Sequence, residues 1–369
     1  MEFNCNRDDL IQAINSAQKA VSSKSTVSLL EGVYLQAKDN WVLLYCTDKE
    51  IGIECRIEAE VFEEGSVVIN ARLFGDVVKN LPEEQVNLAL LSEEKMKLTS
   101  GDSFFILYLL SSEAFPTFPV IERNSEYKMD QMDLKKMFQQ TSFAVSNDEM
   151  RKTLTGILLE SDENELTMVA VDGFRVALRK HKRENVTEKI YVIIPGRTIN
   201  ELIKIIPSNS GELSLYGNEN TVVLEFSNCR VFTRIINGEF FNYKYIVPDE
   251  YVTKITVRRK QLLEAVERAS LLLNAEQVMK NPVIFQIDDD NVIVKALSDL
   301  GNVEEEIKIE MEGECLRVGF NPKYYIEALR AIEDDMITIK FTTTVGQCVI
   351  VPVNHQAYTY LILPVKMGD

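Results

Sequence analysis

The chain of 369 residues is too long for one ordinary hydrophobic core, and its length predicts two or three domains. It is 46 % hydrophobic and 26 % charged, and no apolar run approaches the ~18 residues of a membrane-spanning helix, so we expect a soluble globular protein. The formal net charge of −17 argues against nucleic-acid binding by the average surface, because phosphates repel acidic groups.

The N-terminus, MEFNCNRDDL, lacks the basic and apolar regions of an export signal, so we expect a cytoplasmic protein. With only two histidines and no CxxC pair, the sequence predicts no metal site, and we expect no cofactor. The six cysteines lie mostly in apolar alternating segments, which favours buried free thiols in a reducing compartment. They are Cys5, Cys46, Cys55, Cys229, Cys315 and Cys348.

The predicted elements recur three times along the chain. Each copy begins with an amphipathic helix, continues with two alternating strands around an acidic or Asn-containing turn, and then has a strand that leads into a short amphipathic helix. The three segments are 8–21, 31–48 and 66–82 in the first copy, 133–145, 155–172 and 191–207 in the second, and 260–273, 281–298 and 315–332 in the third.

The register of the copies is constant. Gly32, Gly156 and Pro282 occupy the same place, and Asp48, Asp172 and Ser298 each follow 16 residues later. We therefore predict three domains of the α+β class, each with two helices packed on antiparallel sheets. The polar, Pro-containing stretches FPVIERNSEYKMD and VPDEYVTK place the boundaries, which gives domains 1–125, 126–250 and 251–369.

Basic residues recur on the second helix of every copy. They are seven residues apart, close to two helical turns, so both members of a pair lie on one helical face. A solvated helix face explains any single pair, but recurrence in an acidic chain favours a surface for a polyanion, bound through phosphates without sequence readout. The pairs are Arg72 with Lys79, Arg197 with Lys204, and Lys323 with Arg330.

No catalytic motif of the GxSxG, GxxxxGK[ST], HExxH or GxGxxG type is present, and we expect no enzymatic activity. Asp172 and Arg175, in AVDGFRVAL, could form an acid/base pair, yet Asp-Gly between apolar strands is also a hairpin signal. The repeated position of Asp172 favours a turn, and an enzyme that uses this pair stays a lesser hypothesis.

Four segments in this order and spacing give the chain its resemblance to the bacterial sliding clamps, the DNA polymerase III β subunits. They are SSKSTVSLLEGVYL (22–35), AVDGFRVAL (170–178), INGEFFNYKYIVP (236–248) and YLILPVKM (360–367). The resemblance implies a head-to-tail homodimeric ring with pseudo-sixfold symmetry, helices inside, that slides on duplex DNA. It also implies a tether for the replicative polymerase, the clamp loader and repair proteins, which raises processivity without catalysis.

The resemblance assigns residues to three sites. DNA would be contacted by Lys24, Arg72, Lys79, Arg197 and Lys204, to which the repeat adds Lys323 and Arg330. The ring contact would join Phe105 and Leu107 to Leu271 and Leu272. A hydrophobic groove for short partner peptides would be formed by Leu154, Val171, Gly173, Phe174, Arg175, Val176, Phe241, Tyr245, Ile246, Val345, Leu363, Pro364, Val365, Lys366 and Met367. The alternative is a peptide-binding scaffold of the same fold that does not encircle DNA.

Overall fold

A computed structural model describes residues 1–21, 28–111, 114–123, 126–162, 164–182, 189–248, 250–273 and 282–366. Contacts divide the chain into two compact units, Met1–Leu134 with Lys204–Ile235 and Lys135–Ile203 with Ile236–Asp369. Among the described helices, none has the length and apolar content to cross a lipid bilayer.

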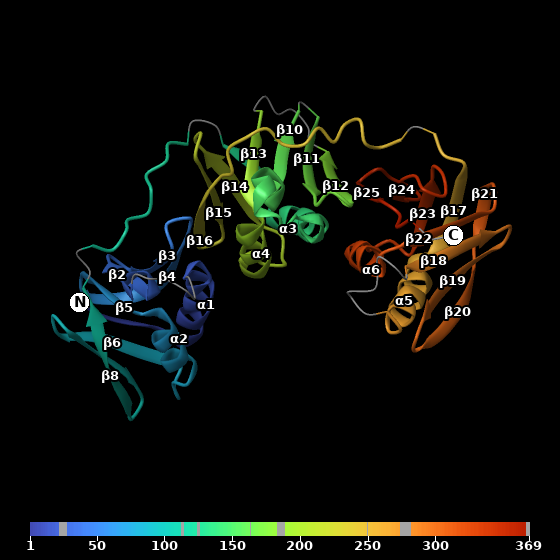
Figure 1. Cartoon of the computed structure of the whole chain (residues 1–369). Coiled ribbons are helices and arrows are strands. Elements are labelled where there is room, and N and C mark those ends of the chain that lie inside the picture. Colours follow the sequence, from blue (N-terminus) through green and yellow to red (C-terminus); the bar gives the residue numbers. More distant parts are fainter. Residues whose placement is uncertain are drawn as a thin grey trace. The chain divides into compact units, whose positions relative to one another are not determined.

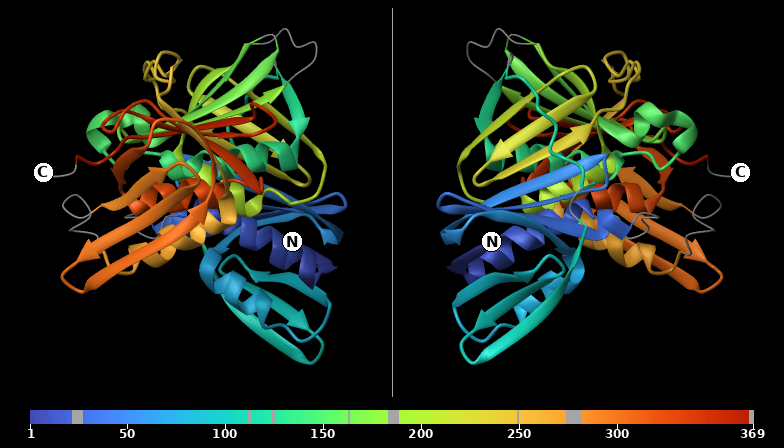
Figure 2. Two further views of the ribbon diagram at one scale, coloured as in Figure 1. Left: turned by 90° about the vertical axis from the view of Figure 1, so that its right-hand side faces the viewer. Right: turned by 90° about the vertical axis from the view of Figure 1, so that its left-hand side faces the viewer.

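The first unit is built on one sheet of 12 strands in the order β1-β6-β7-β8-β5-β2-β3-β4-β16-β15-β14-β9. Helices α1 (Arg7–Ala17) and α2 (Ala71–Lys79) pack against each other and against these strands (Figures 1 and 2). The strands are β1 (Glu2–Asn6), β2 (Gly32–Lys38), β3 (Trp41–Thr47), β4 (Ile51–Glu63), β5 (Gly65–Asn70), β6 (Gln85–Ser92), β7 (Lys95–Ser100), β8 (Ser103–Leu110), β9 (Tyr127–Asp130), β14 (Glu212–Gly217), β15 (Thr221–Phe226) and β16 (Cys229–Arg234).

Strand β4 joins the N-terminal strands to β16. Its first residues pair with β16 from Ile51 opposite Thr233 to Cys55 opposite Cys229, and its last residues pair with β1. At 13 residues β4 is long enough to hold both partners at different points along its length. Residues that lie far apart in the sequence therefore share one sheet face in this unit.

The second unit contains a nine-stranded sheet, β13-β10-β11-β12-β25-β24-β23-β17-β21, and a four-stranded sheet, β20-β19-β18-β22. Helices α5 (Arg259–Ser270) and α6 (Pro322–Ala331) pack together, while α3 (Gln131–Gln139) and α4 (Gly196–Ile205) each cross a boundary between the units. The strands are β10 (Gly156–Ser161), β11 (Glu165–Val171), β12 (Arg175–Lys182), β13 (Tyr191–Pro195), β17 (Thr253–Arg258), β18 (Val283–Asp288), β19 (Asn291–Ser298), β20 (Gly301–Lys308), β21 (Glu310–Gly313), β22 (Leu316–Phe320), β23 (Met336–Phe341), β24 (Cys348–Pro352) and β25 (Tyr358–Ile362).

The structure confirms the repeated pattern of elements. The three predicted hairpins are β2–β3, β10–β11 and β18–β19, and both predicted helices are present in each copy. The helix predicted for 133–145 ends early, at Gln139. Near its end the Thr141 hydroxyl donates to the Met137 carbonyl at 2.8 Å, so a side chain takes the place of a backbone donor.

One cysteine expectation is wrong. Cys55 and Cys229 are not free thiols but form a disulfide between β4 and β16, with their Cα atoms 4.2 Å apart. Each residue alone has the pattern of a buried thiol, and only the pairing of two strands 174 residues apart brings the sulfur atoms together. Cys5, Cys46 and Cys348 are buried and free, as expected, whereas Cys315 is exposed.

The disulfide leads to a test by thiol labelling. We expect a maleimide to label one cysteine of the native protein, Cys315, because the other free thiols are buried. Burial also raises the pKa of the Cys5 and Cys348 thiols to about 12, which leaves little reactive thiolate at neutral pH. Unfolding without reductant should give four labelled residues by mass spectrometry, and reduction should give six. Six labels before reduction would contradict the disulfide.

Candidate functional site

The Asp172 corner is a side-chain-capped turn between β11 and β12. Oδ1 of Asp172 accepts the backbone N–H groups of Phe174 at 2.9 Å and Arg175 at 3.1 Å. Between them Gly173 has φ +96°, in the left-handed region where a side chain is disfavoured. The Asp-Gly pair therefore has a structural role: it sets the direction in which β12 leaves the turn.

The same turn occurs in the other copies. Oδ1 of Asp48 accepts from the N–H groups of Glu50 at 3.0 Å and Ile51 at 2.9 Å, and the hydroxyl of Ser298 accepts from Leu300 N–H at 3.2 Å. The prediction that Asp172 belongs to the repeated architecture is thus confirmed.

Arg175 is the centre of a buried polar network. Its side chain is 6 % exposed; Nε donates to Asp172 Oδ2 at 2.8 Å and Nη1 to Glu327 Oε2 at 2.5 Å. Nη2 donates to the Phe143 carbonyl at 2.5 Å, and the guanidinium lies 4.5 Å from the centre of the Tyr324 ring. Asp172 and Arg175 therefore form an occupied structural ion pair, and this arrangement does not support their use as an acid/base pair.

An apolar cluster in the second unit brings together part of the predicted groove. Leu154, Val171 and Val176 are buried in it, and Ile246 packs against it. The sheet order explains the assembly, because β12 pairs with β25 from Arg175 opposite Ile362 to Arg179 opposite Tyr358. The other members are Leu158, Val169, Leu178, Ile193, Ile236, Phe240, Tyr243, Val349 and Leu361, with Val351 packed against them.

Other predicted groove residues lie around the Phe174 side chain and the end of the chain. Phe174 is 50 % exposed and stacks on Tyr324 with ring centres 6.2 Å apart. Its carbonyl accepts the N–H of Leu363 at 2.9 Å, and Val365 N–H donates to Gly319 at 2.9 Å. The residues after β25 are therefore docked. Pro364 is half-buried and Lys366 is exposed, while Met367 lies outside the described residues.

Besides the residues near Phe174 and the end of the chain, three more predicted groove residues are exposed and lie outside the apolar cluster: Phe241, Tyr245 and Val345. The prediction missed Phe240 and Tyr243, which are buried in the cluster. A sequence signal for both exists, because Phe115 and Phe118 precede them by 125 residues and pack in the corresponding cluster of the first unit. The prediction also missed Tyr324, for which the sequence gives no comparable signal.

The six recurrent basic residues on α2, α4 and α6 are all exposed, as their spacing predicts. Arg72, Lys79 and Lys323 have no ion-pair partner within the part of the chain that the structure describes, whereas Arg330 pairs with Glu267 at 2.8 Å. On α2 the opposite face buries Ala71, Phe74, Gly75 and Val78. Lys24 lies outside the described residues, and contact of any of these groups with DNA stays a prediction.

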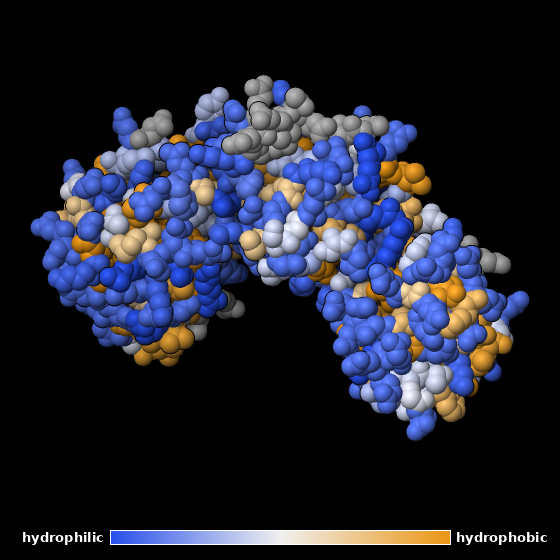
Figure 3. Space-filling view, turned by 180° about the vertical axis from the view of Figure 1, so that it is seen from behind, coloured by the Kyte–Doolittle hydropathy of each residue, from blue (hydrophilic) through white to orange (hydrophobic). Residues whose placement is uncertain are grey.

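Strand β8, which carries the predicted ring-contact residues Phe105 and Leu107, pairs with β7 along its length but with β5 only through Leu109 and Leu110. Phe105 is 37 % exposed and Leu107 is buried. After α5, Leu271 is 80 % exposed and Leu272 is half-buried. Figure 3 shows apolar residues on the surface of the N-terminal part. On β8 the exposed apolar and aromatic residues are Phe104, Phe105, Ile106 and Tyr108.

Comparison with known proteins shows which protein family this chain is similar to. Models of the DNA polymerase III beta subunit match in three parts: the N-terminal domain at residues 1–119, the central domain at 128–242 and the C-terminal domain at 244–366. A Beta sliding clamp from Staphylococcus aureus is 34 % identical over 376 aligned residues, 99 % of each chain. The solved DNA polymerase sliding clamp from Bacillus subtilis has a TM-score of 0.95 at 31 % identity over 100 % of both chains. The solved DNA polymerase III beta chain from Streptococcus pneumoniae has a TM-score of 0.93 at 28 % identity, and the match covers 99 % of this chain and 100 % of that chain.

The Arg175 network gives a stability prediction. Replacement of Arg175 by Ala should lower the free energy of unfolding by about 3 kcal/mol, because Asp172, whose side chain is only 14 % exposed, would lose its counter-ion. Lys260→Ala, which breaks the exposed pair with Glu264, is the matched control and should cost at most about 1 kcal/mol. Urea unfolding followed by circular dichroism measures both, and similar losses for the two variants would contradict the role of Arg175.

Proposed function

The chain belongs to the family of bacterial DNA polymerase III beta subunits and is a DNA sliding clamp, a processivity factor; from this premise we propose that two copies close into a ring around duplex DNA. The recurrent basic pair supports the encirclement most strongly. In a chain of net charge −17, exposed cations recur at one register on the second helix of all three copies.

The charge distribution explains how an acidic protein can hold DNA without reading its sequence. We propose that Arg72, Lys79, Arg197 and Lys204, with Lys24, Lys323 and Arg330, face the phosphates, while acidic residues lie on other surfaces. Contacts to phosphates carry no base information. Water-mediated contacts of this kind exchange readily, so the ring can slide.

The apolar groove is the proposed tether. A short segment with Leu or Phe anchors would pack against the cluster around Leu154, Val171, Val176 and Ile246, with Phe174 beside it. Holding a polymerase on an encircled duplex converts its rebinding into an intramolecular event, which raises processivity without any chemical step. We propose the replicative polymerase, the clamp loader and repair proteins as competing partners, and the bacterial cytoplasm as their location.

The proposed ring contact joins two sheet edges, head to tail. In one copy β8 offers its edge with Phe105; in the other, β20 ends a four-stranded sheet and Leu271 follows the helix that packs on β20. The charges are complementary, since Lys95 and Lys97 lie on β7 beside β8 and Glu304 and Glu306 are exposed on β20. Pairing of these edges would also cover strands that otherwise favour aggregation. Domains at 1–125, 126–250 and 251–369 are part of this proposal.

Retention on circular DNA tests the encirclement. The protein should remain on nicked circular duplex and dissociate when the circle is linearised, because a ring can slide off free ends. Replacing Arg72, Arg197 and Lys204 together by Gln should shorten the lifetime on the circle about tenfold or more, since three phosphate contacts are lost in each copy. Gel filtration of protein–DNA complexes measures the bound fraction with time.

The control variant replaces Lys38, Lys128 and Lys182 by Gln, which changes the net charge by the same amount at exposed positions on strands. Its lifetime on the circle should match that of the natural protein. Equal retention on circular and linear DNA, or no retention at all, would favour the alternative of a peptide-binding scaffold that does not encircle DNA.

The ring contact gives a separate prediction. Leu271→Glu should weaken dimerisation at least about tenfold, because it places a carboxylate within a contact that excludes water. The side chain is 80 % exposed in one copy, so the fold itself should tolerate the change. Val120→Glu, at a residue that is 99 % exposed, is the control. Sedimentation equilibrium measures the dissociation constant, and an unchanged constant for Leu271→Glu would exclude this edge.

A further inference from the structure

A cavity of about 630 Å³, lined by both charged and apolar side chains, borders the apolar cluster of the second unit. We name it the lysine trough, after Lys180, Lys244, Lys254 and Lys340, which line it with residues of β10–β12 and β23–β25 and of the segment before β17. Leu178, Tyr243 and Val351 belong both to the trough and to the groove cluster. A segment bound in the groove can therefore extend into the trough without leaving the protein surface.

The repeat allows a comparison within the chain, because the first unit contains a sheet region that corresponds to the trough. In the first unit β4 pairs with β16, and in the second unit β12 pairs with β25. Each residue pair of the first pairing has a corresponding residue pair in the second. For example, Glu54 lies opposite Arg230 in the first unit, and their counterparts Leu178 and Thr359 lie opposite each other in the second. In the preceding linkers, Phe118 corresponds to Tyr243 at a spacing of 125.

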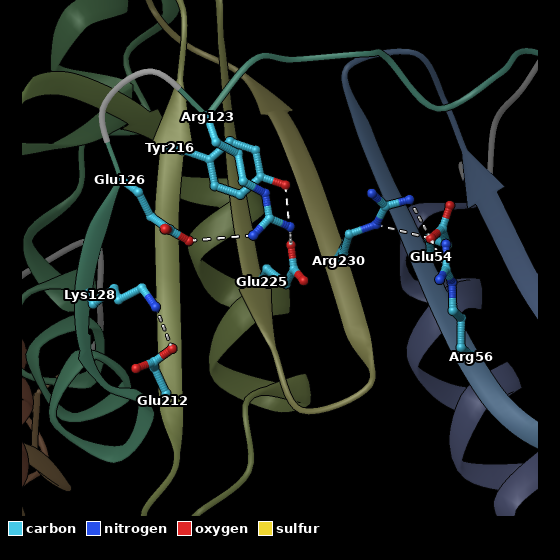
Figure 4. A network of polar contacts seen from close by, with 9 residues as sticks. All are labelled: Glu54, Arg56, Arg123, Glu126, Lys128, Glu212, Tyr216, Glu225 and Arg230. Atoms are coloured by element: carbon cyan, nitrogen blue, oxygen red, sulfur yellow. Dashed lines mark hydrogen bonds and ion pairs between the residues drawn. The ribbon is translucent and has the colours of Figure 1, made fainter.

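In the first unit, the chain's own side chains fill this place (Figure 4). Arg230 donates to Glu54 Oε1 from Nη2 at 2.6 Å, and its guanidinium lies 4.7 Å from the Phe118 ring centre. Arg123 pairs with Glu225 and lies 4.8 Å from the Tyr216 ring centre. Cations and carboxylates of the same chain thus satisfy one another over the sheet.

In the second unit, the residues that fill this place are replaced. By the strand pairings, Glu54, Glu225 and Arg230 correspond to Leu178, Val351 and Thr359, so both carboxylates and the arginine are lost. Tyr216 corresponds to Lys340, which adds a cation. The same framework therefore carries a closed polar cluster in the first unit and an open cavity in the second.

Cations in the trough are neutralised unevenly. At the end near β10 and β11, Lys180 pairs with Glu165 at 2.6 Å and Lys244 with Glu160 at 3.0 Å. The third carboxylate there, Asp162, accepts the backbone N–H groups of Asn164 and Glu165. With two lysines and three carboxylates, that end has a formal net charge of −1.

The opposite end carries the excess positive charge. Lys340 donates to the Tyr251 hydroxyl at 2.9 Å and has no carboxylate partner among the described residues. Lys254 pairs with Glu312 at 2.9 Å, but that carboxylate is 76 % exposed, so the pair is weak and exchangeable. His355 also lines the trough, and its Nε2 lies 3.0 Å from Asp334 Oδ1.

We propose that the lysine trough binds an acidic stretch next to the apolar anchors of the partner peptide, with its carboxylates against Lys340 and Lys254. This inference rests on the proposed use of the groove and adds a specificity element to it. The groove alone selects for apolar anchors, whereas the trough distinguishes partners by the charge of the residues beside the anchors.

Fluorescence anisotropy with three synthetic peptides on the full-length protein tests this. All carry the same Leu-Phe anchors; one has Ser residues on both sides, and the others have three Asp residues before or after the anchors. One acidic peptide should bind about three to ten times more tightly than the Ser peptide at low salt, and the gain should shrink as salt screens the charges.

The variant Lys254→Gln/Lys340→Gln should remove this gain and leave the affinity for the Ser peptide unchanged. Lys308→Gln, at an exposed lysine outside the trough, should keep the gain. A gain that persists in the double variant, or no gain with either acidic peptide while the Ser peptide binds, overturns the trough proposal alone.

Two further outcomes have a distinct meaning. If the Ser peptide does not bind, the groove assignment itself fails, and the trough proposal fails with it. If millimolar inorganic phosphate removes the gain in the natural protein at constant ionic strength, the trough is a site for small anions and the peptide proposal is wrong.

Discussion

The pairing of β12 with β25 is the interaction on which the groove and the trough both depend. It places residues 175–179 against 358–362, so that Val176 and Leu361 share the apolar cluster and Leu178 and Thr359 share the trough. Backbone hydrogen bonds set this register, and a shift by one residue would reverse which side chains face the groove. Arg175 stabilises the start of the pairing, because its guanidinium joins Asp172 in the turn to Glu327 on α6.

The Asp172 turn shows how a repeated element became specific to one copy. Its hydrogen bonds also occur at Asp48 and, in part, at Ser298, so they belong to the common framework. Both copies have positive φ directly after the aspartate, at Lys49 in the first and Gly173 in the second, but the side chains differ: the second copy has Gly173 and the exposed aromatic Phe174, where the first has Lys49 and Glu50. The turn directs the strand, and the residues on it decide whether the surface can take a partner.

Comparison of the two strand junctions extends this principle to electrostatics. Both are antiparallel pairings with an aromatic linker packed on the sheet, through Phe115 and Phe118 in one and Phe240 and Tyr243 in the other. In the first, Arg230 and Glu54 satisfy each other on the sheet, and Cys55 with Cys229 adds a covalent bond. In the second, uncharged Leu178 and Thr359 leave the surface open. Duplication supplied one scaffold twice, and substitution left one junction closed while the other stayed available for binding.

The sequence alone determined the three copies, the six helices and the exposure of the recurrent basic residues, because periodicity of 2 and 3.6 residues and constant spacing are local properties. It also placed Asp172 in a turn. Only the tertiary structure decided which strands pair across long distances, and that pairing created the Cys55–Cys229 bond, the burial of Arg175 and the lysine trough. The pattern that buries Leu107 or Cys55 is the same as for any alternating strand, so their neighbours could not be predicted from it.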